Sequence, residues 1–266
     1  MQDTRHHAVR PVSPEHRHGV FLPEDRTMMF GSFPWPCIHD ADGIFSISIE
    51  REGGFFRYRR TCQDSHVEKT LISEGSAVFI HPVEPINLPK EVTRILEIVF
   101  PPVFIAPESE KTVFLVFPVE IGVFIEKNGD YVLLDVFSLC QPKYSLYGSP
   151  ENGVITRFCQ SRVSDTVPVI DPAREGVLQL TLRNTGRNWV EVSRAVFDSY
   201  FMPLYFDTGA AMTGEMTIFS KMIAETRLQE QPLRDGMTLA IPVIQARKIL
   251  MVDVEKKSFL MEHGVG

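Results

Sequence analysis

The strongest constraint on the fold of this chain is the alternation of apolar and polar residues that runs along much of it. In GIFSISIEREGGFFRYRRTC, residues 43–62, serines and isoleucines alternate ahead of Gly53-Gly54. Successive side chains of a β-strand point to opposite faces, and paired glycines fit the tight turn of a hairpin. The segment therefore predicts two antiparallel strands joined at the glycines.

Two later segments predict hairpins for the same reason. In VEIGVFIEKNGDYVLLDVFSL, residues 119–139, Asn128-Gly129 separates two apolar runs. Both residues tolerate the positive φ that a tight hairpin turn requires. VLQLTLRNTGRNWVEVSRAVFDSY, residues 177–200, alternates on both sides of a turn rich in Asn and Gly. We expect its two strands to pair with each other, as neighbouring strands often do in immunoglobulin-like sandwiches.

The remaining runs are less regular but also favour strands. EMTIFSKMIAETRLQ, residues 215–229, fits a helical stripe almost as well as a strand, and its strand neighbours favour β. The Pro101-Pro102 pair lies inside the apolar run RILEIVFPPVFIAP. Proline donates no ladder hydrogen bond, so this pair predicts a bend or a sheet edge.

These patterns together predict an all-β protein built from two β-sandwich domains, immunoglobulin-like or jelly-roll-like, packed together. We place a polar leader at residues 1–26, an N-terminal β domain at 27–145 and a C-terminal β-sandwich at 146–266. A single long barrel or sandwich is the alternative. With 44% hydrophobic residues over 266 positions, the chain can bury a sizeable core.

The charge and the cysteine content limit which cellular compartment and which partners we expect for this protein. The chain has 27 basic and 34 acidic residues, a net charge of −7, which makes general nucleic-acid binding unlikely. The four cysteines form no CxxC pair, and one disulfide is the alternative to four free thiols. Without a secretory apolar region or a run of about 20 apolar residues, we expect a cytoplasmic protein with no membrane insertion.

Several common chemistries lack their sequence signatures. The chain contains no GxxxxGK[ST], no GxGxxG between a strand and a helix, and no GxSxG. The histidines beyond residue 26 are scattered, without HxH or HExxH spacing. We therefore expect no cofactor, no metal site and no assigned catalytic residue, and enzymatic activity is the less favoured interpretation.

One segment concentrates basic and aromatic residues. Arg57, Arg59 and Arg60 alternate with Phe55, Phe56 and Tyr58. Such a surface can bind an anion or a single-stranded nucleic acid by stacking and charge. The favoured interpretation is a solvated strand whose charges prevent mispairing.

The most distinctive segment is KYSLYGSPENGVITRF, residues 143–158. Tyr144 and Tyr147, together with Lys143 and Arg157, can line a ligand pocket between the domains, where the aromatic faces and cations would hold an anionic molecule. Alternatively the tyrosines wedge between the domains with their hydroxyls on backbone groups, as in a tyrosine corner. We favour the corner.

This segment, with LQLTLRNTGRNWVEVSRAVF and FPVEIG, resembles an uncharacterised family of archaeal proteins that is known only as a domain of unknown function. The similarity rests on a Lys-Tyr-x-Leu-Tyr-Gly run followed by Pro150, Gly153 and Arg157. It implies a cytoplasmic β protein from archaea and carries no catalytic assignment.

Two functional hypotheses remain. The first is a non-enzymatic β-sandwich protein that binds a protein partner or forms a homo-oligomer. The second is a small-molecule or anion-binding protein, or an enzyme, whose site lies at the junction of the two β domains.

Overall fold

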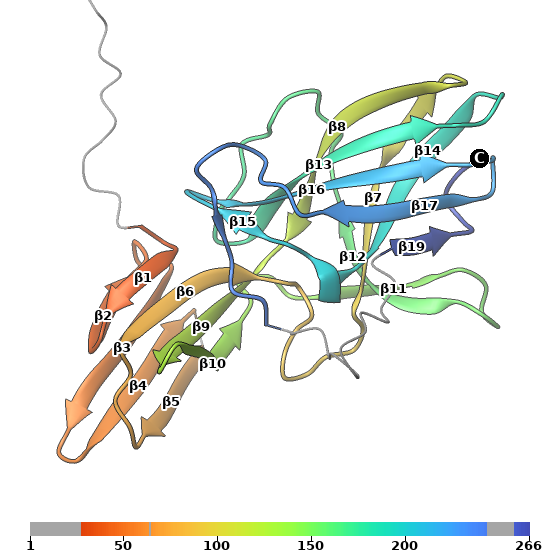
Figure 1. The fold of residues 1–266 in the computed structure, drawn as a ribbon. Helices are drawn as coiled ribbons and strands as arrows, with labels where there is room; N and C mark the ends of the chain where they lie inside the picture. The colour runs from red at the N-terminus through yellow and green to blue at the C-terminus, as the bar shows by residue number, and fades with distance from the viewer. Residues whose placement is uncertain (1–27, 64, 244–257) are drawn as a thin grey trace, which may run out of the picture.

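The computed structural model describes residues 28–63, 65–243 and 258–266, and within them the chain is almost entirely β (Figure 1). Nineteen strands and one short 3₁₀ helix, η1 (Ser199–Phe201), are present in these residues. The predicted all-β class is therefore confirmed, and several packed sheets form it. The predicted leader, residues 1–26, lies outside the described residues.

The first pair of sheets occupies the lower left of Figure 1 and contains two four-stranded sheets. One sheet has the order β1 (Gly31–Pro34), β6 (Ala77–Val83), β9 (Glu120–Lys127) and β10 (Asp130–Phe137). The other has the order β2 (Cys37–Asp40), β3 (Phe45–Glu52), β4 (Phe55–Cys62) and β5 (Ser65–Leu71). Alternate residues of β3 and β4 are buried between the sheets, as the period-two pattern requires.

The second pair of sheets occupies the upper right of Figure 1. Its smaller sheet has the order β11 (Lys143–Tyr147), β12 (Val154–Gln160), β7 (Ile95–Ile105) and β14 (Val190–Asp198). The larger sheet has the order β18 (Thr238–Leu239), β15 (Tyr205–Phe206), β16 (Ala210–Ile218), β13 (Glu175–Asn184) and β8 (Ser109–Pro118). At one side of it, β17 (Ala224–Gln229) pairs with β16 and with β19 (Ser258–Met261).

The strands follow the sequence pattern closely. β3 and β4 form the predicted hairpin at Gly53-Gly54, and β9 and β10 form the predicted hairpin at Asn128-Gly129, where φ is 57° and 87°. Within residues 215–229 the favoured β structure is found, as the end of β16 (Ala210–Ile218), a turn at 219–223 and β17 (Ala224–Gln229). Pro101-Pro102 lies where β12 no longer pairs with β7 and where the β7–β14 register shifts, so the predicted bend or sheet edge takes the form of a local edge on one side of β7.

The expected hairpin over residues 177–200 is wrong in its pairing. Both strands form, but β13 pairs with β8 and β16, whereas β14 pairs with β7 in the facing sheet. The side chain of Asn184 accounts for the crossing locally. Its amide donates to the backbone oxygens of Ala106 and Asn188, at 3.0 and 2.8 Å, and thereby attaches the turn after β13 to the turn between β7 and β8.

The sheets do not divide at residue 145. The chain leaves the first pair after β6, contributes β7 and β8 to the second pair, and then returns to form β9 and β10. β8 pairs with β13 and β7 pairs with β14, so strands from before residue 145 lie inside the second pair of sheets. That the two pairs of sheets fold as separate domains stays a prediction.

Candidate functional site

Tyr147 connects the mid-chain hairpin to the end of the described chain. Its ring is buried and packs edge-on against Phe259 and His263. Its hydroxyl donates to the backbone oxygen of His263 at 3.0 Å and accepts from the backbone N–H groups of Glu262 and His263, at 3.1 and 3.0 Å. Burial raises the pKa of Tyr147, although the two backbone donors act in the opposite direction. These contacts are those of a structural corner.

Arg157 connects the two pairs of sheets. It is 2% exposed, and its guanidinium forms a 2.7 Å ion pair with Glu120 on β9 and donates to the backbone oxygen of Pro85 at 3.3 Å. The carboxylate of Glu120 also accepts from the backbone N–H of Asn87 at 3.0 Å. Burial raises the pKa of Glu120 despite the adjacent Arg157 cation. Because this guanidinium is occupied internally, it does not face solvent.

Lys143 and Tyr144 lie on the surface instead. Both are exposed, and the Tyr144 hydroxyl accepts a long hydrogen bond, 3.4 Å, from the Asn87 side chain. Tyr144 and Arg157 are register partners across the β11–β12 hairpin. The structure thus brings the four sequence-predicted residues onto one hairpin, with Tyr147 and Arg157 inside and Lys143 and Tyr144 outside. Their role in binding a ligand stays a prediction.

Sequence reasoning missed a buried carboxylate beside this hairpin. Glu97 on β7 is 2% exposed and accepts hydrogen bonds from Ser145 at 2.5 Å and Thr156 at 2.7 Å. Arg194 on β14 completes the cluster with a 2.9 Å ion pair. The available signal was a glutamate inside the apolar run RILEIVF, because a charge in such a run is rarely buried without partners.

The basic-aromatic segment is matched by acidic neighbours. Arg57 and Arg59 project from one face of β4 and form ion pairs with the glutamates of the adjacent strands, Glu50, Glu52 and Glu68. Arg60 points to the other face, is 5% exposed and pairs with Asp135 at 2.7 Å. The interstrand pairs support the interpretation of a solvated sheet, while anion binding by this segment stays an untested prediction.

A short segment after β18 joins the two pairs of sheets through polar groups. Ala240 donates its backbone N–H to Leu204 in the second pair, at 2.8 Å. Ile241 and Val243 donate theirs to His81 Nδ1 at 3.1 Å and to Glu84 Oε2 at 3.3 Å in the first pair. Both acceptors are buried, and Glu84 Oε1 has no hydrogen-bond partner within the described residues.

The acceptors in this junction have shifted pKa values. Burial lowers the pKa of His81 to about 4, and the imidazole lies among the rings of Phe79, Phe124 and Phe206. Burial also raises the pKa of Glu84 to about 7, and the nearby Glu120 carboxylate adds to that rise. Proton uptake at this junction is therefore linked to how the two pairs of sheets are held together.

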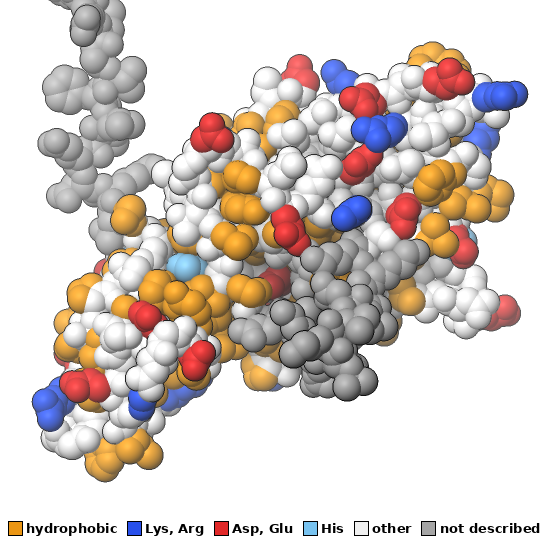
Figure 2. All heavy atoms as spheres, in the orientation of Figure 1, with side chains coloured by type: hydrophobic (Ala, Val, Ile, Leu, Met, Phe, Trp, Pro, Cys, Tyr) orange, Lys and Arg blue, Asp and Glu red, His pale blue; other side chains and the backbone are white. Residues whose placement is uncertain are grey.

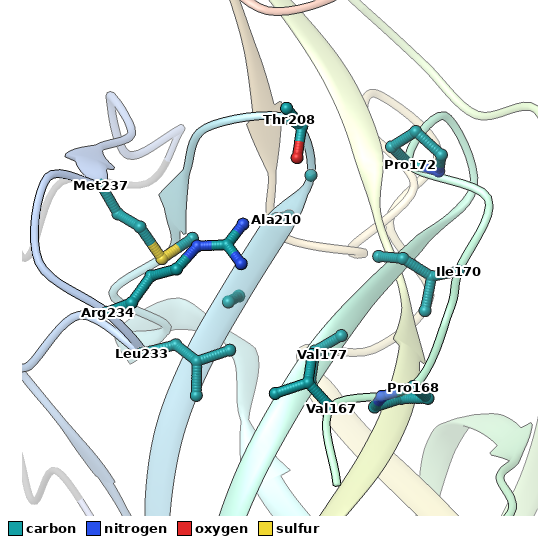
Figure 3. Close-up of a pocket in the computed structure, with 12 residues that line it drawn as sticks. Val167, Pro168, Ile170, Pro172, Val177, Thr208, Ala210, Leu233, Arg234 and Met237 are labelled. Atoms are coloured by element: carbon teal, nitrogen blue, oxygen red, sulfur yellow. The ribbon is translucent and has the colours of Figure 1, made fainter. Parts of the chain in front are cut away.

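A pocket of about 280 Å³ opens beside the start of β16 (Figure 3). Figure 3 shows the guanidinium of Arg234 facing Ile170 and Val177 across the pocket. Asp207 holds Arg234 through two hydrogen bonds, at 2.7 and 2.8 Å. Burial opposes ionisation of Asp207, but Arg234 and backbone N–H groups outweigh it, so its pKa is lowered. The walls are mainly apolar: Val167, Pro168, Ile170, Pro172, Val177, Ala210, Ala211, Leu233 and Met237.

The outer face of the mid-chain hairpin is apolar and open. Leu146 and Ile155 are cross-strand neighbours and are 47% and 51% exposed, with Tyr144 beside them at 38%. β11 is an edge strand, paired only with β12 in the part of the chain that the structure describes. An apolar face next to an unpaired backbone edge is a template for association with another strand.

The described residues contain no group of three or more histidine, cysteine, aspartate or glutamate side chains arranged to hold a metal ion. No helix in the described part of the chain is long and apolar enough to cross a membrane.

Residues 29–262 match the model of DUF432, described as a protein of unknown function. The chain belongs to the DUF432 family. A search of curated proteins and a search of solved structures found no match. The expected membership of a family of unknown function is thus confirmed for DUF432. The archaeal origin and the mid-chain run as a family motif stay predictions.

Proposed function

We propose that this protein is a non-enzymatic interaction module that associates with a second copy of itself through β11. The observation that carries the proposal is the open edge of β11 beside the exposed pair Leu146 and Ile155. Large apolar side chains and an unpaired strand edge both favour association, and here they lie on the same hairpin.

The sequence of β11 suits antiparallel pairing with an identical strand. If two copies pair around Ser145, Tyr144 of one copy lies opposite Leu146 of the other, and Lys143 lies opposite Tyr147. An aromatic–aliphatic pair stabilises an antiparallel sheet, and no like charges oppose each other in this register. A twofold axis through Ser145 also closes the assembly, as in most homodimers.

Light scattering during size-exclusion chromatography tests this proposal over a wide range of protein concentrations. We expect a dimer that dissociates on dilution, and that Leu146→Lys or Ile155→Lys converts to a monomer. Val169→Lys is the matched control, because Val169 is fully exposed in a different part of the second pair of sheets. A wild-type protein that is monomeric at every concentration would overturn the proposal.

The pocket beside β16 supports a second candidate function, the binding of a small aliphatic anion. Arg234 Nη1 has no hydrogen-bond partner within the described residues, and most of the residues that line the pocket are apolar. A carboxylate with a short alkyl chain matches this combination, because its head group accepts from the guanidinium and its chain is buried.

Calorimetric titration with octanoate, and with octanol as the uncharged comparison, tests this candidate. We expect octanoate to bind more tightly, and Arg234→Gln to remove the difference. Arg162→Gln, at an exposed position outside the pocket, is the control. Equal weak binding of both compounds, or of neither, contradicts a site for an aliphatic anion.

The four cysteines support the cytoplasmic location expected from the sequence. All are free thiols, and Cys37 and Cys62 are buried. Free thiols are typical of proteins from reducing compartments. We therefore place this interaction module in the cytoplasm.

A further inference from the structure

Three turns lie together at the end of the second pair of sheets that is farthest from β1–β5 in Figure 1. They are residues 106–108 after β7, residues 185–189 after β13 and residues 219–223 after β16, and we call them the distal turns. The backbone N–H of Glu108 donates to Gly186 at 3.3 Å, and that of Thr185 donates to Ile218 at 3.0 Å. The distal turns are therefore joined to one another rather than separate loops.

The distal turns are held from within by polar side chains. Asn184 is 1% exposed, and its amide oxygen accepts from the backbone N–H of Gly186 at 2.9 Å, while its amide nitrogen donates to neighbouring turn carbonyls. Ser220 Oγ accepts from the backbone N–H groups of Met222 and Ile223, both at 3.2 Å. The Ile223 carbonyl accepts from Phe219 and Ser220. These internal hydrogen bonds reduce the backbone polarity that must be desolvated when this surface is covered.

These turns expose large apolar side chains. Trp189 is 61% exposed, Phe219 48%, Met222 70% and Ile223 42%. Figure 2 shows hydrophobic side chains gathered at the end of the molecule where β16 and β17 meet, with both basic and acidic side chains at the same end. Ser220 and the turn hydrogen bonds fix the backbone so that these side chains point outward. An exposed apolar patch of this kind marks an interaction surface.

Two cations accompany the apolar side chains. Arg187 and Lys221 lie in the same turns as Trp189 and Met222, are exposed, and form no ion pair within the described residues. Glu108, in the turn after β7, is the acidic residue of the distal turns, and Glu110, exposed near the start of β8, pairs with Arg183. Arginine in the turn after β13 and lysine in the turn after β16 thus place positive charge beside the residues that protrude.

We propose that the distal turns dock onto a lipid surface that carries anionic head groups. Trp189, Phe219, Met222 and Ile223 would enter the boundary between head groups and acyl chains, and Arg187 and Lys221 would contact the head-group phosphates. Tryptophan is enriched at this boundary, and cations near an anionic surface add to the attraction. The contact lies on the membrane and requires no spanning segment.

The shape and chemistry favour lipid over a protein partner. The apolar side chains stand on the tips of adjacent turns, which can enter a fluid interface without a complementary cavity. Part of their backbone is hydrogen-bonded within the turns, which lowers the cost of contact with acyl chains. This surface is distinct from the edge of β11, so it stands or fails independently of the proposed self-association.

Vesicle binding tests the proposal, with Trp189 as the reporter. The chain has two tryptophans, so a Trp35→Phe background leaves Trp189 as the only indole fluorophore. We expect a blue shift of emission and co-sedimentation with vesicles of phosphatidylcholine and phosphatidylglycerol, and much less with phosphatidylcholine alone. Met222→Glu with Ile223→Glu should weaken vesicle binding about tenfold or more, because two apolar side chains that would be buried in the lipid are lost.

Control variants distinguish binding through the distal turns from nonspecific hydrophobic adsorption to vesicles. Ile72→Glu changes an isoleucine beside the first pair of sheets that is 82% exposed, more than Met222 or Ile223, and should leave vesicle binding unchanged. Arg187→Gln with Lys221→Gln should remove the preference for anionic vesicles and the sensitivity to salt. Absence of binding to either vesicle, equal binding to both, or equal loss with Ile72→Glu would overturn the proposal. A change of oligomeric mass in Met222→Glu would instead assign the surface to a protein contact.

Discussion

Arg157 on β12 and Glu120 on β9 form a buried ion pair, 2.7 Å between nitrogen and oxygen, that joins the two pairs of sheets. Neither group is accessible, since the side chains are 3% and 1% exposed. A buried pair gains Coulomb energy in a low-dielectric setting but loses the hydration of both ions. Its main consequence is that neither partner can be removed alone without leaving an isolated buried charge.

Arg157→Met should therefore destabilise the protein by about 3–5 kcal/mol, because Glu120 would remain buried without its cation. The double change Arg157→Met with Glu120→Leu should recover much of that loss. Urea denaturation measures both free energies of unfolding. As a control, Arg183→Met removes a cation that is 49% exposed and should cost about 1 kcal/mol or less. Equal effects at Arg157 and Arg183 would contradict a buried joining role.

Tyr147 provides a second test at the same hairpin. Tyr147→Phe removes a hydroxyl that makes hydrogen bonds with the backbone of Glu262 and His263, and leaves two N–H groups without an acceptor. We expect a loss of about 1–3 kcal/mol in the free energy of unfolding. Hydrogen exchange at the Glu262 and His263 amides should accelerate at the same time.

Tyr144→Phe is the matched control on the same strand. Its hydroxyl accepts one long hydrogen bond at the surface, so its removal should change stability by about 0.5 kcal/mol or less. If the two substitutions have the same effect, Tyr147 does not act as a corner between β11 and the end of the described chain.

The strands could be predicted from the sequence because alternation is a local property. Runs such as residues 43–62 carry the period-two pattern whatever they pair with, and Asn128-Gly129 determines a turn by its own backbone preference. Pairing depends on distant residues instead. The side chain of Asn184 attaches its turn to Ala106, and nothing in residues 177–200 identifies that partner. A local pattern likewise cannot predict that the chain returns to the first pair of sheets to form β9 and β10.

The chemistry of the mid-chain segment depends on partners that lie far away along the chain. Tyr147 contacts His263, and Arg157 contacts Glu120, 37 residues earlier. An arginine near two tyrosines has the same local sequence whether it faces a ligand or a buried carboxylate. The buried site around Glu97 could not be predicted for a related reason. Its partners Ser145, Thr156 and Arg194 come from three other strands.

Because of Glu84, the free energy of unfolding should fall as pH rises above the ordinary pKa of a glutamate. Burial raises its pKa from 4.5 to about 7, so the folded state binds a proton that the unfolded state has released. The contribution of Glu84 to the free energy of unfolding is therefore fully present below pH 4.5. It falls by about 3 kcal/mol as pH rises to about 7. Glu84→Gln keeps an acceptor for Val243 and should remove this slope in urea midpoints measured across the range. Glu74→Gln, at an exposed position, should leave the slope unchanged.

His81 should produce the opposite slope over nearly the same range. Burial lowers its pKa from 6.5 to about 4, so the folded state resists protonation. Its contribution is fully present above pH 6.5 and is lost as pH falls through 4, again by about 3 kcal/mol. Protonation at Nδ1 would also remove the acceptor for the Ile241 N–H.

Because both groups hold the segment after β18, their slopes should largely cancel between about pH 4.5 and 6.5 in the wild-type protein. Each single variant should expose the other slope. The free energy of unfolding of His81→Gln should fall as pH rises, and that of Glu84→Gln should rise. In the double variant it should again change little with pH, apart from the contribution of the other carboxyl groups. Differences between urea denaturation curves isolate these terms. If either single variant keeps the wild-type pH profile, the corresponding group does not titrate in the junction as described.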